Sequence, residues 1–155
     1  MEKKIEIGYY NYTIDSLPTA DKELVVEAQL ALKKAYPKYS GFSVGAAVRL
    51  KSGKILHGAN SESEVFPSGI CAERSVLYYA EAIHSDDPVE ALAIASDPSE
   101  RESYPCGACR QVMGEFAADL AETEVLLASL DGSYITETVA TIMPYPFVNF
   151  KPQED

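Results

Sequence analysis

The sequence predicts a single α/β domain, a three-layer α/β/α sandwich built on a mixed sheet of about five strands. Three observations predict this class. Apolar residues alternate at strand spacing in some segments and recur at helical spacing in others. A short, continuously apolar stretch such as residues 91–96 is typical of a strand buried on both faces. The length of 155 residues fits one domain, which we assign to residues 19–155, with residues 1–18 as an N-terminal extension.

Turn residues and apolar spacing place the elements along the chain. The expected elements are an edge strand within 5–14, a helix begun by Thr19 or Asp21 and ended by Pro37, strands at 44–50 and 55–60, a helix over about 71–84, a strand at 91–96, a helix over about 106–118, and strands at 125–129 and 134–137. The expected turns are Ser52-Gly53 and Asp131-Gly132. The unit from 91 to 129 should form a right-handed parallel crossover.

The helix over 71–84 has the clearest one-sided pattern. Ser68 is a suitable residue to cap it. Its buried face is expected to consist of Ala72, Val76, Tyr79, Ala80 and Ile83. The helix over 106–118 shows a similar stripe, made of Cys109, Val112, Met113 and Phe116.

The balance of charge excludes some classes of partner. The net charge is −11, and the Lys and Arg residues are scattered. Proteins that bind long nucleic acids carry basic patches, because phosphate contacts dominate their affinity, so nucleic acid is not expected here. No apolar run approaches the ~20 residues that span a bilayer, and the first residues lack the apolar stretch of a signal peptide. We therefore expect a cytoplasmic protein that acts on a small molecule, with neither nucleic acid nor membrane as partner.

All three cysteines fall in two short motifs, C-A-E at 71–73 and P-C-G-A-C at 105–109. Cys106 and Cys109 are three residues apart at the start of an expected helix, so their sulfurs can face one metal ion. Cys71 begins another expected helix, and a helix N-terminus favours the thiolate form. Three thiolate ligands leave the fourth position of a zinc ion open to water, which indicates a catalytic rather than a structural site.

Glu73 and Arg74 complete this constellation. Residues i and i+2 do not share a helix face, so Glu73 and Cys71 serve one site only if it lies beyond the helix end. Glu73 would then take a proton from the zinc-bound water as a general acid/base, since zinc lowers the pKa of that water to about 7. Three thiolates outweigh the charge of one zinc ion, and Arg74 could donate hydrogen bonds to two of them and restore the Lewis acidity of the metal.

Other chemistry fits parts of this pattern. A lone C-x-x-C occurs in redox sites and in half of a structural zinc site. A structural site needs a fourth ligand, and neither His57 nor His84 stands at the spacing of a zinc knuckle. The combination of C-A-E with P-C-x-x-C is more specific, because it is close to the H-x-E…P-C-x-x-C pattern of zinc deaminases. A non-enzymatic structural zinc domain is the alternative from another class.

From about residue 36 to residue 147 the sequence resembles the cytidine deaminase family of small, homotetrameric, zinc-dependent enzymes. The motifs that carry the resemblance are YSGFSVGAA at 39–47, similar to Y-S-x-F-x-V-G-A-A; GANSE at 58–62, similar to G-x-N-x-E; CAER at 71–74 and PCGACRQ at 105–111, which match outright; and MPYPF at 143–147, similar to L-P-x-x-F. Ser63 departs from the pattern, because members often carry a second Asn there, as N-x-E-N.

The resemblance implies a cytidine deaminase-like fold and a reaction. Cytidine and deoxycytidine would be deaminated by water to uridine and deoxyuridine, with release of ammonia, in pyrimidine salvage. It implies one zinc ion per subunit, held by Cys71, Cys106 and Cys109, with Glu73 as the proton shuttle between water and the pyrimidine. Gln111 is expected beside Arg74, around the metal ligands.

The resemblance also implies how the substrate is held. Asn60 and Glu62 would bind the ribose 3′-hydroxyl, which suits an amide and a carboxylate. Phe42 would stack on the pyrimidine, and Ala72 would contact the base through its main chain. Phe147, with Phe150 as its rival, would reach the site of a neighbouring subunit in a homotetramer whose active sites are shared.

Two other types of deaminase share part of this pattern with the cytidine deaminase family. A blasticidin-S deaminase has a similar zinc motif but lacks the arginine of C-A-E-R and the N-x-E pair, so Arg74, Asn60 and Glu62 favour cytidine. A polynucleotide-editing deaminase commonly uses H-x-E where this chain has Cys71, and needs contacts along a nucleic-acid strand.

Overall fold

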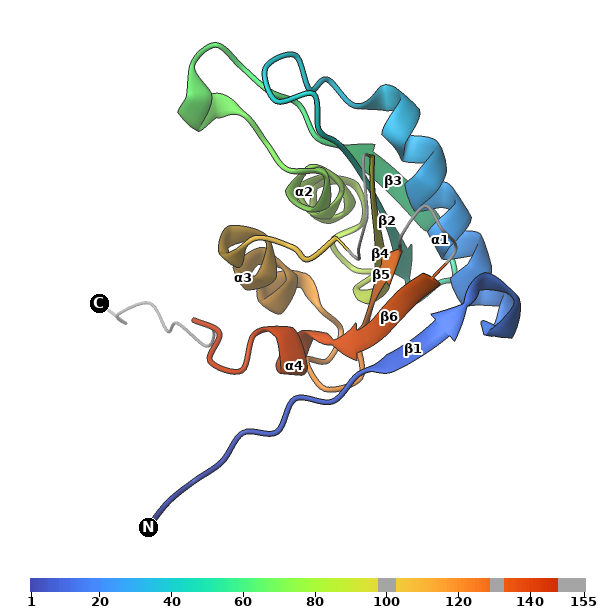
Figure 1. The fold of residues 1–155 in the computed structure, drawn as a ribbon, viewed down its shortest axis with the longest axis vertical. Coiled ribbons are helices and arrows are strands. Elements are labelled where there is room, and N and C mark those ends of the chain that lie inside the picture. The colour runs from blue at the N-terminus through green and yellow to red at the C-terminus, as the bar shows by residue number, and fades with distance from the viewer. Residues whose placement is uncertain (98–102, 129–132, 148–155) are drawn as a thin grey trace.

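The computed structural model describes residues 1–97, 103–128 and 133–147. The strands are β1 (Tyr10–Thr13), β2 (Ser43–Leu50), β3 (Ile55–Ala59), β4 (Val89–Asp97), β5 (Glu124–Ala128) and β6 (Ser133–Thr138), and the helices are α1 (Thr19–Ala31), α2 (Ala72–His84), α3 (Gly107–Phe116) and α4 (Val139–Ile142). Helix α1 covers one face of the sheet, and helices α2 and α3 cover the other (Figure 1). The expected three-layer α/β/α arrangement is thus confirmed. No helix of the described part is long and apolar enough to cross a bilayer.

The sheet has six strands, in the order β1-β6-β5-β4-β2-β3. β4 and β5 pair in parallel, as the crossover prediction requires, and every other pair is antiparallel. The β2–β3 hairpin turns at Ser52-Gly53 as expected, where Gly53 has a positive φ of 87°. The Asp131-Gly132 turn and the end of the 125–129 strand lie outside the described residues.

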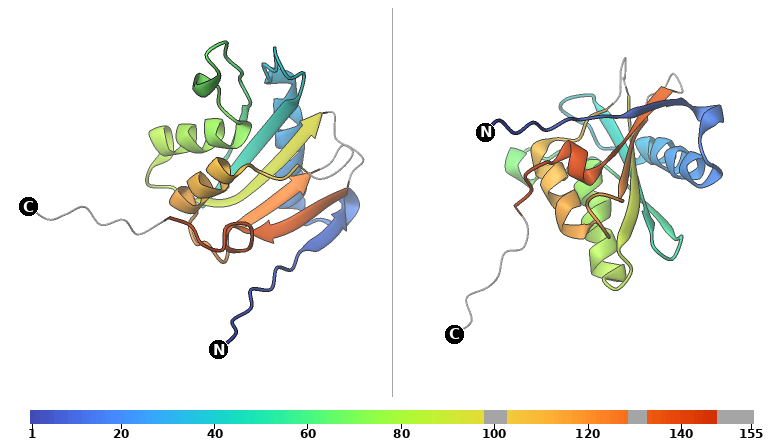
Figure 2. Two further views of the ribbon diagram at one scale, coloured as in Figure 1. Left: turned by 60° about the vertical axis from the view of Figure 1, so that its left-hand side comes forward. Right: turned by 90° about the horizontal axis from the view of Figure 1, so that it is seen from below.

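The sixth strand, one more than the expected count of about five, is the edge strand predicted within 5–14 of the N-terminal extension. β1 pairs with β6 over four residues and forms one edge of the sheet. The hydroxyl of Tyr134 donates to the carbonyl of Thr13 at 2.7 Å, and the rings of Tyr12 and Tyr134 stack with centroids 6.0 Å apart. Leu17 is buried beneath α1. Residues 1–9, in contrast, lead away from the body of the molecule (Figure 2).

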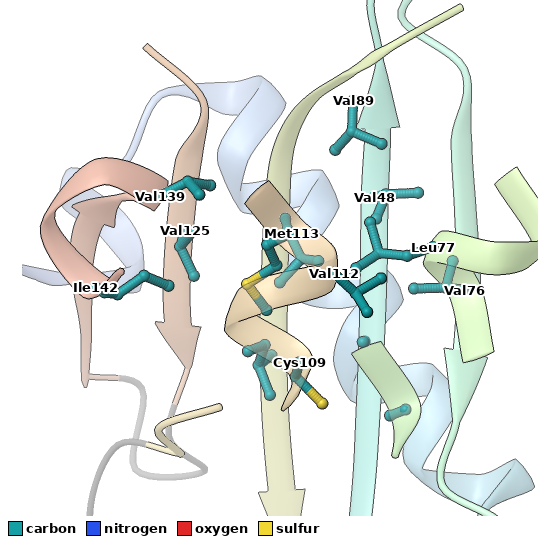
Figure 3. Packing of buried hydrophobic residues seen from close by; sticks show 14 of the residues in the cluster. Val48, Val76, Leu77, Val89, Cys109, Val112, Met113, Val125, Val139 and Ile142 are labelled. Carbon is teal, nitrogen blue, oxygen red and sulfur yellow. The ribbon is translucent and has the colours of Figure 1, made fainter. Parts of the chain in front are cut away.

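β4 is apolar along its length because both of its faces are covered. Leu92 and Ile94 point into the core beneath α2 and α3, whereas Ala93 and Ala95 point toward α1. The core on the α2 and α3 side is built from larger aliphatic side chains, such as Met113 and Leu77, which lie between helix and sheet (Figure 3).

The α1 side of the sheet is lined by small residues because the helix lies close to it. A Cβ atom on Gly45 would stand 2.1 Å from the carbonyl oxygen of Ala28 and 2.8 Å from the amide nitrogen of Leu32. Only glycine therefore fits at this point of β2.

The first helix differs in detail from its prediction. Neither proposed cap forms a side-chain cap bond, since α1 begins at Thr19 with Pro18 in the N-cap position. Asp21 is buried instead, and its carboxylate accepts a hydrogen bond from Arg49 Nη1 at 2.8 Å. The α-helix ends at Ala31 and continues as a 3-10 turn over Leu32–Lys34, before Pro37.

The second helix differs in its start and in its buried face. Ser68 lies in a separate 3-10 turn, Phe66–Ser68, and the N-cap position of α2 is held by Cys71. Tyr79 and Ile83 of the predicted buried face are 52% and 57% exposed, whereas Leu77 is 1% exposed. The apolar residues of α2 cover more than one side of the helix, so periodicity alone did not select the side that packs on the sheet. The predicted stripe of α3 is confirmed, with Phe116 only partly buried.

Candidate metal centre and substrate cleft

Two helix N-termini place the three cysteines. Cys71 is the N-cap residue of α2 and Cys106 is the N-cap residue of α3; both have extended backbone, so each side chain projects from the helix end. Cys109 lies in the first turn of α3 and is fully buried. Because β3 and β4 both run antiparallel to β2, both strands end at the same edge of the sheet, and α2 and α3 begin beyond that edge.

The three sulfurs form one cluster. Cys106 Sγ lies 3.4 Å from Cys109 Sγ and 4.0 Å from Cys71 Sγ, and all three lie within 4.8 Å of one another. Sulfurs bound to one tetrahedral zinc at ~2.3 Å stand about 3.8 Å apart, so the spacing fits a single ion. No other His, Cys, Asp or Glu of the described chain joins this group.

Neither histidine of the chain is a fourth ligand. His57 Nδ1 lies 3.0 Å from Glu27 Oε2, and its Nε2 lies 2.9 Å from Lys34 Nζ. His84 Nε2 lies 3.3 Å from Lys54 Nζ. Both rings are thus engaged outside the sulfur cluster. A donor set of three thiols, with no fourth protein ligand among the residues that the structure describes, is the arrangement that leaves one metal position open.

The thiols share charge unequally. Hydrogen bonding from the neighbouring Cys109 and Arg74 side chains lowers the pKa of Cys71 to about 5. Hydrogen bonding to Cys71 and burial raise the pKa of Cys109. One thiolate is therefore stable in the cluster without a cation, and a divalent cation would offset the repulsion between further thiolates.

Glu73 is buried in the first turn of α2, with only 4% of its surface exposed. Burial raises the pKa of its carboxyl group, and the nearby Cys71 sulfur acts in the same direction. The side chain lines the same cleft as Cys71 and Cys106. The structure thus holds a carboxyl group that can exchange protons beside the sulfur cluster.

Arg74 reaches the sulfurs from the next position of α2. Its Nη2 lies 3.7 Å from Cys71 Sγ, and hydrogen bonding to Cys71 raises the pKa of the guanidinium, so the group stays cationic. Its Nε is buried and has no hydrogen-bond partner within the described part of the chain. The guanidinium thus places a positive charge beside the Cys71 sulfur.

A cleft of about 1350 Å³ opens above the cluster. Phe42, Asn60 and Glu62 line the same cleft as Glu73, and so does Ile94 of β4. Asn60 follows β3, and its side chain accepts from the Val44 amide at 2.8 Å and donates to the Phe42 carbonyl at 2.9 Å. The loop that carries Phe42 is thereby fixed to the end of β3.

Glu62 is held by three donors of one short segment. Its Oε2 accepts from the amides of Tyr39 at 2.6 Å and Ser40 at 3.0 Å, and its Oε1 accepts from the hydroxyl of Ser40. These hydrogen bonds lower the pKa of Glu62, with the Ser40 hydroxyl as the first cause, so the carboxylate stays ionised and can only accept.

The remaining predicted residues lie at the border of this site or outside it. Ala72 is buried at the start of α2. The side-chain amide of Gln111 accepts from the Phe147 amide at 2.8 Å and donates to the Phe147 carbonyl at 2.6 Å. Phe147 is 72% exposed and does not line the cleft of its own chain, and Phe150 lies outside the described residues.

Residues that the sequence reasoning did not single out also shape the cleft. They are Tyr39, Ser40, Val44, Ser61, Phe66, Gly69, Ile70, Ile94, Ser103 and Tyr104. Ser40 could have been found, because it lies inside the YSGFSVGAA motif, between Tyr39 and Phe42. The hydroxyl of Ser103 contacts that of the buried Ser96, a pairing of β4 with the loop before α3 that no local pattern indicates.

A buried acid beside three thiols, in a cleft at one edge of a mixed sheet, defines an α/β protein with a candidate metal site of the catalytic type. Residues 18–122 match the family model of the cytidine and deoxycytidylate deaminase zinc-binding region. The chain therefore belongs to this deaminase family.

Individual relatives agree with this assignment. A cytidine deaminase of Halalkalibacterium halodurans is 41% identical over 124 residues, which are 80% of this chain and 91% of the relative. The crystal structure of a cytidine deaminase from Burkholderia pseudomallei superimposes with a TM-score of 0.74 at 35% identity, covering 81% of this chain and 97% of that one. A blasticidin-S deaminase of Bacillus cereus is 26% identical over 133 residues, 82% of this chain and 91% of the relative.

Proposed function

We propose that this protein is a hydrolytic deaminase of cytidine and deoxycytidine, which yields uridine and deoxyuridine with ammonia. One observation supports this proposal above the others. Glu73 and two of the cysteine thiols line one cleft together with Asn60, Glu62 and Phe42. The cleft thus combines groups that can activate water with groups that suit a sugar and an aromatic ring.

The metal in this proposal is zinc, one ion per subunit, held by Cys71, Cys106 and Cys109. When bound, zinc supplies Lewis acidity and makes water a nucleophile near neutral pH. Arg74 offsets the excess negative charge of the thiolates, because its guanidinium lies beside Cys71.

Glu73 moves the protons of the reaction. One proton of the water passes through its carboxyl group to N3 of the pyrimidine while the oxygen joins C4. The second proton leaves with the 4-amino group as ammonia, and C4 becomes the carbonyl of the product. Burial of Glu73 keeps bulk water from competing as the proton donor.

Other residues in and beside the cleft position the substrate. Phe42 stacks on the pyrimidine, and the main chain at Ala72 contacts the base. The ionised carboxylate of Glu62 accepts a hydrogen bond from the 3′-hydroxyl of the sugar, and Asn60 completes the pair. The exocyclic amine then lies toward the cysteines.

We further propose that the protein works as a cytoplasmic homotetramer in pyrimidine salvage. Three free thiols at a metal site need a reducing compartment. The cleft is larger than the 300–1,000 Å³ that is usual, roughly, for one small ligand, so a neighbouring subunit could close it. Phe147, exposed and held through its main chain by Gln111, is the residue offered to that neighbour.

Ammonia release from cytidine by the zinc-loaded protein tests the activity. Turnover by the wild type and its loss in Glu73→Gln is the expected result, since the amide cannot carry the proton. Retention of zinc by the variant shows that its site is intact. Blasticidin S is the comparison substrate, and turnover of it without turnover of cytidine would overturn the proposal.

A further inference from the structure

The carboxylate of Glu62 and the ring of Phe42 are connected by one hydroxyl group. The Ser40 hydroxyl donates to Glu62 Oε1 and accepts from the Phe42 amide, whose nitrogen lies 3.0 Å away. A serine hydroxyl has one proton to donate, and here that proton is directed at the carboxylate. The Ser40 side chain therefore contacts two of the residues that are proposed to hold the substrate, one for the sugar and one for the base.

Counting acceptor sites shows what this hydroxyl leaves free. An ionised carboxylate has about four lone-pair sites. Two on Oε2 are taken by the amides of Tyr39 and Ser40, and one on Oε1 is taken by the Ser40 hydroxyl. Glu62 thus keeps one acceptor site, on the oxygen that Ser40 holds.

The Phe42 main chain is held at both of its polar groups. Ser40 accepts from its amide, and Asn60 Nδ2 donates to its carbonyl at 2.9 Å. The side chain of Phe42 is 42% exposed. The two hydrogen bonds therefore fix the main chain from which the ring projects.

We propose that Ser40 is a positioning residue for substrate binding, which fixes the one free acceptor of Glu62 toward a sugar hydroxyl and holds the main chain of Phe42. The inference rests on the proposed function, since it names how that site selects its sugar. Ser40 acts through Glu62 and Phe42 and is not itself a catalytic residue.

Two substrates that differ only in the 3′-hydroxyl separate this role from a merely structural one. The measurement is kcat/KM for 2′-deoxycytidine divided by kcat/KM for 2′,3′-dideoxycytidine, each on the same preparation. This ratio cancels the fraction of active protein. A loss common to both substrates reports on Phe42, whereas a change in the ratio reports on Glu62.

The variants are Ser40→Ala and Ser40→Thr, with Ser43→Ala as the matched control. Ser43 begins β2 nearby and does not line the cleft. We expect Ser40→Ala to lower the ratio roughly tenfold, the effect of one charge-assisted hydrogen bond. Ser40→Thr keeps the hydroxyl and should restore most of the ratio, and Ser43→Ala should match the wild type.

The outcomes are distinguishable. An unchanged ratio in Ser40→Ala, with the wild type discriminating between the substrates, would overturn the role of Ser40 and leave the deaminase proposal standing. Equal kcat/KM of the wild type for both substrates would also overturn the role of Ser40, because Glu62 would then not bind the 3′-hydroxyl. Absence of turnover in the zinc-loaded wild type would overturn the proposed function, and the inference with it.

Discussion

The sulfur of Cys71 lies 4.0 Å from the sulfur of Cys106, although 35 positions separate the two residues in the chain. Each is the N-cap residue of a different helix, so two helix N-termini converge on one point. Because positive ends of helix dipoles favour anions, this convergence favours the thiolate form of the two cysteines. The thiolate is the form of cysteine that binds a metal cation.

Replacing Cys106 by Ser is expected to abolish stable zinc binding. Elemental analysis after dialysis should give about one zinc per chain for the wild type and close to none for the variant. Zinc should also raise the Tm of the wild type only, since a ligand that binds the native state stabilises it. His84→Ala is the control, because His84 contacts Lys54 and not the sulfurs. Loss of zinc in the control would contradict the three-thiol donor set.

Replacing Arg74 by Gln should lower kcat/KM roughly 10- to 100-fold while zinc is retained, as is usual when a group that supports metal ligands is removed. The pKa of Cys71 should rise, because hydrogen bonding from Arg74 contributes to lowering it to about 5. Steady-state kinetics beside zinc analysis checks this. Arg74→Lys keeps the positive charge, so its kcat/KM should lie between those of the wild type and Arg74→Gln. Wild-type kinetics in Arg74→Gln would show that the guanidinium does not act on the thiolates.

Replacing Gly45 by Ala should destabilise the fold by about 1–3 kcal/mol or more, the usual effect of overpacking. The new Cβ would collide with the Ala28 carbonyl and push α1 off the sheet. Urea denaturation followed by circular dichroism measures the effect. Gly8→Ala is the control, since a Cβ at that position meets nothing within 4 Å. Equal stability of the two variants would mean that α1 can shift at little cost.

Replacing Glu137 by Gln should stabilise the protein more at pH 8 than at pH 4. Glu137 is buried, and burial raises its pKa above the ordinary value of 4.5 while the charge of Arg110 acts against this. The native state therefore holds the proton at pH values where the unfolded chain has released it, so stability falls as pH rises through that interval. Glutamine does not ionise, so the stability of the Glu137→Gln variant does not fall with pH for this reason.

Thermal unfolding of the wild type and Glu137→Gln at the two pH values measures the difference in Tm. Glu81→Gln is the control, because Glu81 is exposed, and it should change Tm by the same small amount at both pH values. A Tm difference for Glu137→Gln that does not grow with pH would contradict the assignment of the buried carboxyl.

The sequence predicted the cysteine cluster more fully than it predicted the packing around that cluster. Cys71, Cys106 and Cys109 could be grouped because their spacing and residue type reflect the chemistry that they perform. The ion pair of Asp21 with Arg49 could not, because it joins α1 to β2 and depends on how the helix lies on the sheet.

The same limit explains the misplaced face of α2. Tyr79, Ile83 and Leu77 are all apolar, and only the position of the sheet decides that Leu77 is buried. An edge strand within 5–14 was predicted, but its partner was not, since β1 is held by pairing with β6 and by the hydroxyl of Tyr134, a residue at the far end of the chain. Local patterns carry no information on such distant partners.

The two hydrogen bonds between the Gln111 amide and residue 147 have a consequence for how this chain can diverge. Both bonds go to main-chain atoms, one to the N–H and one to the C=O, so the glutamine imitates a neighbouring strand. Such an anchor fixes where the polypeptide passes and ignores which side chain it carries. Any residue that keeps its N–H can be displayed at that point, so a substitution at position 147 would change the side chain that is presented there without moving the main chain, provided that Gln111 is kept.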